Sequence, residues 1–228
     1  MRPGIVAPLA TMVAAVLVSG CERAGPGTPV AAEGTVSSTT GSTTEPAPPS
    51  VPGVATTVPD SIPPDALACF QPPDAAGVAT VAQVGDPAAP RITVDVPPGW
   101  TATPGGATPE VALTLAGPDG LTGSVSIART PLDPGTAFDE YSDAVFDNSG
   151  VSVLNVLPAE FCGYSSQRLF GNWSDQAGQT IEHADRIAHI WTETGDYLVT
   201  VHLQGPAGAP GFGVARDLLT ADFSIVIP

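Results

Sequence analysis

The clearest alternation of apolar and polar residues lies in the second half of the chain. Residues 91–96, Arg-Ile-Thr-Val-Asp-Val, alternate with a period of two and run into Pro97-Pro98-Gly99, which predicts a strand followed by a turn. Two further runs, 111–116 and 124–129, flank Gly-Pro-Asp-Gly at 117–120, a sequence typical of a hairpin loop. We therefore expect these two strands to pair in an antiparallel fashion.

Two segments have the spacing of amphipathic helices. Asp133 and Pro134 suit an N-cap and a first helical turn, and the apolar positions that follow recur at three and four residues, which predicts a helix over 134–146. A second helix is expected over 210–221, with Val214, Leu218 and Ala221 as its apolar face.

The remaining strand-like runs complete a sheet. They cover residues 151–157, 161–172, 180–192, 197–203 and 223–227. Thr194-Gly195 is expected to be a tight turn, with Glu193 facing Asp196. Strands with interspersed helices predict an α/β or α+β sandwich, formed by one globular domain over 65–228.

The segment before this domain has a different composition. Residues 21–64 are rich in Ser, Thr, Pro, Gly and Ala and contain almost no large apolar residue. Such a segment cannot bury enough apolar surface to offset the roughly 1 to 2 kcal/mol per residue that ordering a backbone costs. We predict a disordered stalk.

The first twenty residues have the features of an export signal. Arg2 precedes an apolar run over 5–18, and the run is too short to span a bilayer. Leu17-Val18-Ser19-Gly20-Cys21 has the form of a lipobox, which predicts cleavage before Cys21 and lipid attachment to its thiol. The alternative is an ordinary secretory signal. With the lipobox interpretation, the chain is anchored at the extracytoplasmic face of the cell membrane.

The charge excludes several partners and chemistries. The formal net charge is −16, and the chain has no lysine. No basic stripe can neutralise nucleic acid, and no lysine amine is present for Schiff-base chemistry. A nucleic-acid partner is therefore not expected.

Four segments carry a resemblance to a known family. They are the lipobox with its stalk, residues 90–100 (PRITVDVPPGW), residues 162–171 (CGYSSQRLFG), and the strand pair that ends in residues 197–204. In pattern and spacing they resemble the LpqN family of actinobacterial lipoproteins. The resemblance implies a PsbP-like α/β/α sandwich with a mainly antiparallel sheet and two principal helices, and it brings no established catalytic residues. Cys162 departs from the pattern, in which a glycine is expected.

The cysteine count points to one disulfide. Lipidation of Cys21 leaves Cys69 and Cys162 as an even pair in an oxidising compartment. A disulfide is the expected outcome, and two unpaired thiols are the alternative.

Histidines and one carboxylate share a predicted sheet face. With Thr194-Gly195 as the turn, His202 lies opposite Ile187, on the same face as His183, His189 and Asp185. Such side chains could hold zinc. Because six residues span roughly 20 Å along a strand, His183 and His189 cannot both reach one ion. We predict neither a metal nor another cofactor.

Signatures of hydrolases are missing from the sequence. Gly163-Tyr164-Ser165-Ser166-Gln167 lacks the second glycine of a nucleophile elbow. Asp139, Glu140 and Asp143 could form a paired-acid site on the first helix, but a charge run there is usually a solvated face. We therefore expect a non-catalytic envelope module that binds a partner protein, a lipid or a glycan. The alternative is an envelope hydrolase with an unrecognised carboxylate and histidine site.

Overall fold

The structure is a computed structural model that describes residues 51–55, 66–74, 76–148, 153–174 and 177–228. All of them belong to one compact unit that spans residues 47–228. The predicted signal peptide, the lipidation site at Cys21 and the stalk, apart from residues 51–55, lie outside the described residues.

Eleven strands, two α-helices and one 3-10 turn form the described part of this unit. In chain order they are β1 (Leu67–Cys69), β2 (Val78–Ala82), β3 (Arg91–Val96), β4 (Thr101–Pro104), β5 (Val111–Ala116), η1 (Pro118–Gly120), β6 (Thr122–Thr130), α1 (Pro134–Asn148), β7 (Val153–Pro158), β8 (Ser165–Ser174), β9 (Thr180–Thr192), β10 (Gly195–Pro206), α2 (Phe212–Leu219) and β11 (Ser224–Val226).

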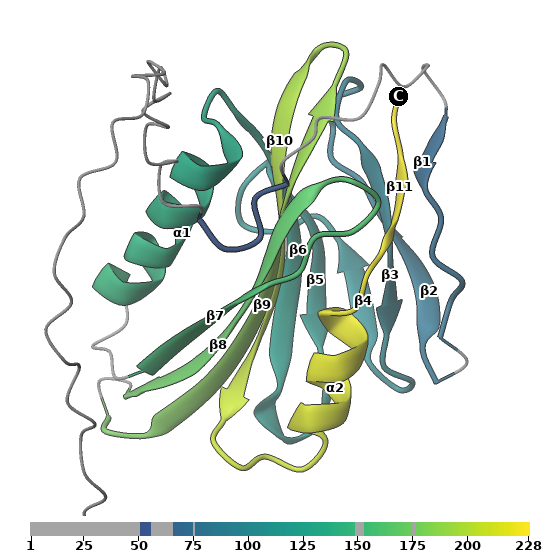
Figure 1. Cartoon of the computed structure of the whole chain (residues 1–228). Helices are drawn as coiled ribbons and strands as arrows, with labels where there is room; N and C mark the ends of the chain where they lie inside the picture. Colours follow the sequence, from purple (N-terminus) through teal and green to yellow (C-terminus); the bar gives the residue numbers. More distant parts are fainter. Residues whose placement is uncertain (1–50, 56–65, 75, 149–152, 175–176) are drawn as a thin grey trace, which may run out of the picture. The chain divides into compact units, whose positions relative to one another are not determined.

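The strands form two sheets whose described neighbours all pair antiparallel. The larger sheet has the order β4-β5-β6-β10-β9-β8-β7, and the smaller one has the order β1-β11-β3-β2 (Figure 1). The large sheet is built from consecutive strands except where β10 inserts beside β6. This mainly antiparallel α+β architecture with two principal helices confirms the predicted fold class.

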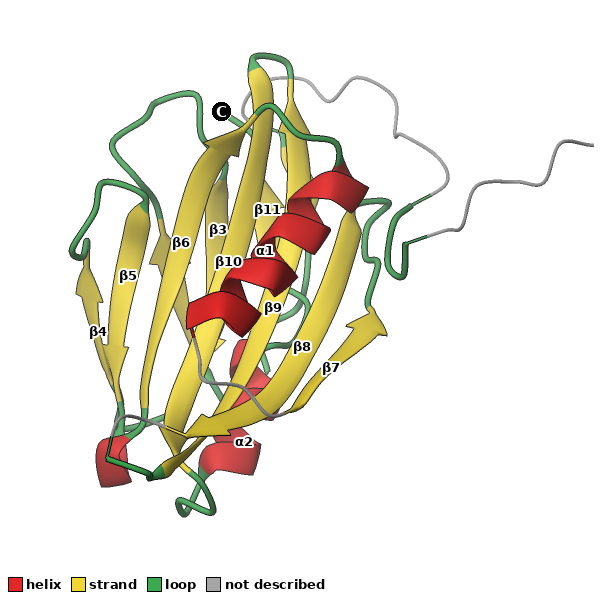
Figure 2. Cartoon of the chain, turned by 90° about the vertical axis from the view of Figure 1, so that its left-hand side faces the viewer, coloured by secondary structure: helices red, strands yellow, loops and turns green. Residues whose placement is uncertain are grey.

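Helix α1 lies across one face of the seven-stranded sheet (Figure 2). Phe138 of α1 is buried against Leu169 of β8 and Ile187 of β9, and Tyr141 packs beside them. Asp133 caps the helix as predicted, because its Oδ1 accepts a hydrogen bond from the Thr136 backbone N–H at 3.1 Å.

The opposite face of this sheet carries the larger core. Its apolar side chains pack against those of the four-stranded sheet and of α2. The four-stranded sheet shares this layer with α2, a feature that the sequence pattern did not predict. Its strands are short and come from both ends of the domain, so no local pattern announces that they pair.

Helix α2 is shorter than predicted, and two residues of its expected apolar face were wrong, namely Val214 and Ala221, which lies beyond the end of the helix. Gly211 has a left-handed backbone (φ 82°) and precedes the helix, which begins at Phe212. Val214 is 63% exposed, and the buried face consists of Phe212, Ala215, Leu218 and Leu219. The helix begins two residues later than predicted, so Phe212 lies in its first turn and the buried side chains follow a different stripe.

The β9–β10 hairpin has a different register from the predicted one. Gly195 pairs with Thr192, so Glu193 and Thr194 form the loop and His202 lies opposite Asp185 rather than Ile187. Thr192 donates its hydroxyl to the Gly195 carbonyl at 2.8 Å. Gly195 has a φ of 153°, a backbone conformation that residues with a side chain rarely adopt.

The structure contains the disulfide that the cysteine count predicts. It joins Cys69 of β1 to Cys162, with 5.7 Å between their Cα atoms. Cys162 and Gly163 both have positive φ (51° and 81°) between the bridged residues Phe161 and Tyr164, as in a two-residue type I′ turn. A left-handed residue explains why a glycine would be expected at position 162.

Residues 51–55, which the sequence analysis assigned to the stalk, contact the seven-stranded sheet. The Ser166 N–H donates to the Gly53 carbonyl at 2.8 Å, and the Ala55 N–H donates to Ser165 Oγ at 2.9 Å. Val54 packs against the small core under α1. A Cβ on Gly53 would lie 2.1 Å from the Ser166 carbonyl oxygen, and its φ is 77°.

We expect Gly53→Ala to release this segment from the sheet. Each hydrogen bond that is lost should cost about 0.5 to 1.5 kcal/mol of the free energy of unfolding, so the melting temperature should fall by several degrees. Differential scanning calorimetry measures the shift. The control is Gly213→Ala in α2, where a Cβ meets no atom within 4 Å. Equal melting temperatures for Gly53→Ala and wild type would contradict the contact.

The disulfide makes a second prediction. In the chain-entropy view, closing a loop of this length stabilises the fold by roughly 4 to 5 kcal/mol, so reduction should lower the melting temperature markedly. In a Cys69→Ser background, Cys162→Gly should be more stable than Cys162→Ala by about 1 kcal/mol, because alanine is strained at positive φ. Urea denaturation compares the two. If the Cys162→Ala protein is as stable as the Cys162→Gly protein, the backbone at position 162 is not left-handed.

Candidate functional site

Asp185 is the centre of a buried polar cluster between α1 and the seven-stranded sheet. Its side chain is fully buried, and both carboxylate oxygens are hydrogen-bonded. The Tyr141 hydroxyl donates to Oδ1 at 3.1 Å, His183 Nδ1 lies 3.0 Å from Oδ2, and His202 Nδ1 lies 2.5 Å from Oδ1. Because the carboxylate accepts, both imidazoles carry their proton on Nδ1.

The cluster shifts the pKa values of Asp185, His202 and Tyr141. Burial alone would raise the pKa of Asp185, but the hydrogen bonds and charges of His183 and His202 hold it below the usual value. For His202, burial opposes the charged form, and the hydrogen bond and charge of Asp185 outweigh it, so the pKa is raised. Burial, together with Asp185, raises the pKa of Tyr141 well above 10.0. The cluster therefore stabilises an anionic Asp185 beside a cationic His202.

The second ring nitrogen of His202 also has a hydrogen-bond partner, whereas His183 makes a ring-packing contact. His202 Nε2 lies 3.3 Å from Gln204 Oε1, and the His183 ring packs on Trp173 with centroids 4.8 Å apart. Ser124 of β6 lies directly opposite His202. No hydrogen bond between these two side chains is found in the described structure, so this part of the chain contains an acid–histidine pair without a positioned serine. The arrangement supports a structural role in which the cluster holds α1 on the sheet.

The other residues singled out by the sequence are not part of this cluster. His189 is on the same face, as predicted, but its Nε2 lies 2.9 Å from the Leu132 carbonyl oxygen. Asp139, Glu140 and Asp143 are exposed on α1. Among the residues described, no group of three or more His, Cys, Asp or Glu side chains is arranged to hold a metal ion.

A trough runs between α2 and the outer strands β7 and β8, mainly on the face of the sheet opposite α1, although His183 of the Asp185 cluster also lines it. It consists of two hollows of about 340 and 290 Å³ that share Phe170 and Arg216. The first hollow is lined by Val153, Asn155, Phe170, Gly171, Asn172, Glu182, His183, Ala207, Phe212 and Arg216, and the second by Leu157, Arg168, Leu169, Phe170, Ala184, Arg216, Asp217 and Thr220.

Arg186 lies next to the second hollow, opposite Arg168 in the register of the sheet. Its Nη2 donates to Asp222 Oδ1 and to the Ala159 carbonyl, both at 2.7 Å, and the guanidinium lies 4.8 Å from the Phe161 ring centroid. Nη1 reaches the Thr220 carbonyl just beyond α2, where a cation complements the helix dipole. Burial lowers the pKa of Arg186 to about 10, although Asp222 opposes this shift.

The sequence analysis did not find the trough, because its lining comes from β7, β8, β9 and α2 and forms no motif. One signal was present in the composition. The chain has seven basic residues, all arginine, and three of the five in the described part (Arg168, Arg186 and Arg216) lie at this trough or directly behind it.

The Asp185 cluster predicts a pH dependence of stability. The pKa of His202 is raised on folding, so its contribution is complete below about 6.5 and is lost as the pH rises through the folded-state value. We expect the free energy of unfolding to fall from pH 6 to pH 9 in the wild type and much less in His202→Gln. Chemical denaturation across this range measures both.

Tyr141→Phe is the matched control for this experiment. It removes one donor to Asp185 and should cost about 1.5 to 3 kcal/mol at every pH, because a hydrogen bond to a charged group is lost. It leaves His202 in place, so the slope with pH should remain. An unchanged slope in His202→Gln would show that His202 does not carry the effect.

The comparisons with known proteins give one structural similarity to report. No family model and no curated protein matches the chain. The structure is similar to the crystal structure of LpqN of Mycobacterium tuberculosis, described as involved in cell envelope biogenesis, with a TM-score of 0.47 and 17% identity. The match covers 65% of this chain and 91% of that one. No helix in the described residues is long and apolar enough to cross a membrane.

Proposed function

We propose that the chain is a lipid-anchored protein of the cell envelope whose domain is a non-catalytic binding module, with the trough beside α2 as its ligand site. The observation that carries this proposal is the trough itself. Apolar side chains that include Phe170, Ala184 and Phe212 line it together with a similar number of polar and charged side chains, so it offers both an apolar surface and groups that can orient a ligand.

The N-terminal sequence supports the location. A lipobox cysteine would take acyl chains that hold the protein at the membrane without a spanning helix. The Ser/Thr-rich stalk, as a flexible coil of about 43 residues, would give a tether of about 35 to 40 Å. The disulfide between Cys69 and Cys162 suits an oxidising compartment outside the cytoplasm.

The Asp185 cluster supports binding over hydrolysis. A hydrolytic site needs a nucleophile beside the imidazole and donors for the oxyanion. Here His202 Nε2 lies against Gln204 instead. Backbone N–H groups of the surrounding strands are used in the sheet ladders, so they are not free to stabilise an oxyanion. The cluster instead holds together the face of the sheet that lies opposite the trough.

A fluorescent acyl ester tests binding and hydrolysis with one probe. We expect the monoglyceride ester of a pyrene-labelled fatty acid to bind the mature protein and to remain intact. Leu157→Trp, which places an indole at the trough, should weaken binding at least tenfold. Fluorescence titration measures the affinity, and chromatography measures any release of fatty acid.

The control is Val81→Trp, an exposed strand position on β2 in the other sheet, which should bind the probe as the wild type does. If all three proteins bind alike, the trough is not the site. Release of fatty acid that disappears in a folded His202→Ala protein would replace the proposal with the hydrolase alternative.

A further inference from the structure

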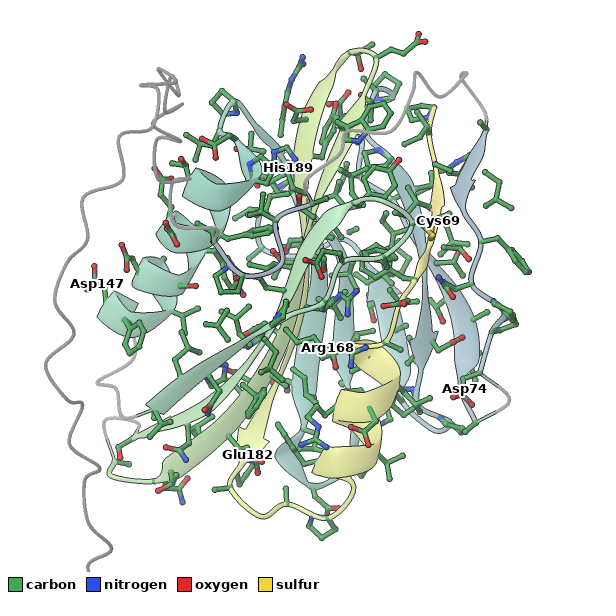
Figure 3. All side chains as sticks on the ribbon, viewed as in Figure 1. Cys69, Asp74, Asp147, Arg168, Glu182 and His189 are labelled. Carbon is green, nitrogen blue, oxygen red and sulfur yellow. A yellow bond between two sulfur atoms is a disulfide. The ribbon has the colours of Figure 1, made fainter. Side chains whose placement is uncertain are left out.

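Three of the five arginines in the described part of this acidic chain lie close together. The net charge is −16 with no lysine, yet Arg168 and Arg216 both line the trough and Arg186 lies behind it. Figure 3 shows Arg168 beside the end of α2 that leads into β11, and Glu182 near the opposite end of the helix. The hollow that contains Arg168 is lined by two arginines and Asp217, whereas the hollow that contains Glu182 is lined by that carboxylate and Arg216. The balance of charge is therefore positive only at the Arg168 end.

Two of these arginines face each other across neighbouring strands. Arg168 of β8 is the register partner of Arg186 of β9. Like charges directly opposite in a sheet repel, and this repulsion adds to the lowering of the pKa of Arg186. Arg186 is buried and compensated by Asp222, whereas Arg168 is exposed and, in the described part of the chain, forms no ion pair. An anion beside Arg168 would relieve the repulsion.

Arg216 can bind the same anion from the other side of the trough. It lies on α2 and lines both hollows. Its ion pair is with the adjacent Asp217, at 2.8 Å, and both side chains are well exposed, so the pair contributes little. A guanidinium offers five N–H donors in a fork that matches phosphate or carboxylate oxygens.

The rest of the trough suits an apolar chain. Phe170 lines both hollows, and Phe212 and Val153 continue the apolar surface away from Arg168. Glu182 would repel an anionic head at that far end, so the two ends specify a direction. The head would lie by Arg168 and the tail along Phe170 towards Phe212.

On the basis of the binding function proposed above, we propose that the trough takes an amphiphile with a phosphate or carboxylate head, held between Arg168 and Arg216, with its apolar chain along Phe170. The ligand class is thus an anionic single-chain lipid. A free inorganic anion would use only the arginines, and a neutral amphiphile would use only the apolar walls.

The test compares two pyrene-labelled probes with the same acyl chain, lysophosphatidic acid and the neutral monoglyceride, on the full mature protein. We expect the phosphate probe to bind at least tenfold more tightly in low salt, and this preference to shrink as salt screens the charges. Arg168→Gln and Arg216→Gln should each remove most of the preference while leaving the affinity for the neutral probe nearly unchanged. Arg91→Gln, an exposed strand residue away from the trough, removes the same charge and should keep the preference.

The outcomes separate this inference from the binding function on which it rests. Equal affinity for the two probes would overturn the anionic head but leave the trough as a binding site. No binding of either probe would overturn both proposals. A preference that survives in both arginine variants would contradict the role of the arginines. The last experiment uses inorganic phosphate alone. If phosphate stabilises the fold as much as lysophosphatidic acid does at equal concentration, the acyl chain does not contribute and the lipid part of the inference is wrong.

Discussion

The fold depends on two neighbouring buried charges that must be satisfied on opposite faces of one strand. Asp185 and Arg186 are consecutive residues of β9, near the middle of the large sheet, and successive side chains of a strand point to opposite faces. An unpaired buried charge costs several kcal/mol, so each of them requires partners in the layer that it faces. Those partners come from α1, β9 and β10 on one face, and from the loop at Ala159 and the residues that follow α2 on the other.

Each charge positions a different layer. Asp185 takes its donors from α1 and β10, which fixes α1 across one face of the sheet. Arg186 takes its acceptors from the Ala159 loop, from the residue after α2 and from Asp222 before β11. The second set holds the C-terminal end of α2 above the sheet. The trough is the space that remains between α2 and the outer strands. Because the acceptors of Arg186 hold α2 in this position, they also determine where the proposed ligand site lies.

The two faces of the large sheet differ in which polar groups remain accessible to a ligand. On the α1 face, the polar groups around Asp185 form hydrogen bonds with one another, and most nitrogen atoms of the two imidazoles already have a partner. On the α2 face, Arg168 and Arg216 keep exposed guanidinium groups above an apolar floor. Polar groups that bind one another add rigidity, whereas exposed guanidinium groups next to apolar side chains are accessible to a ligand. This contrast is the physical reason for placing binding at the trough.

The sequence by itself determined the local elements and the features that follow from the spacing and number of residues of one type. Alternation located β3, β5 and β6, the Asp133 cap located the start of α1, and the cysteine count predicted the disulfide. It also placed His183, His189, His202 and Asp185 on one face, because a shift of two residues in the register leaves every side chain on the same face of the sheet. Only the tertiary structure decided that His202 faces Asp185, that a four-stranded sheet joins α2, and that Arg168 and Arg216 meet across a trough. Those relations depend on packing between segments far apart in the chain, whereas patterns in a sequence report only the period and the ends of each segment.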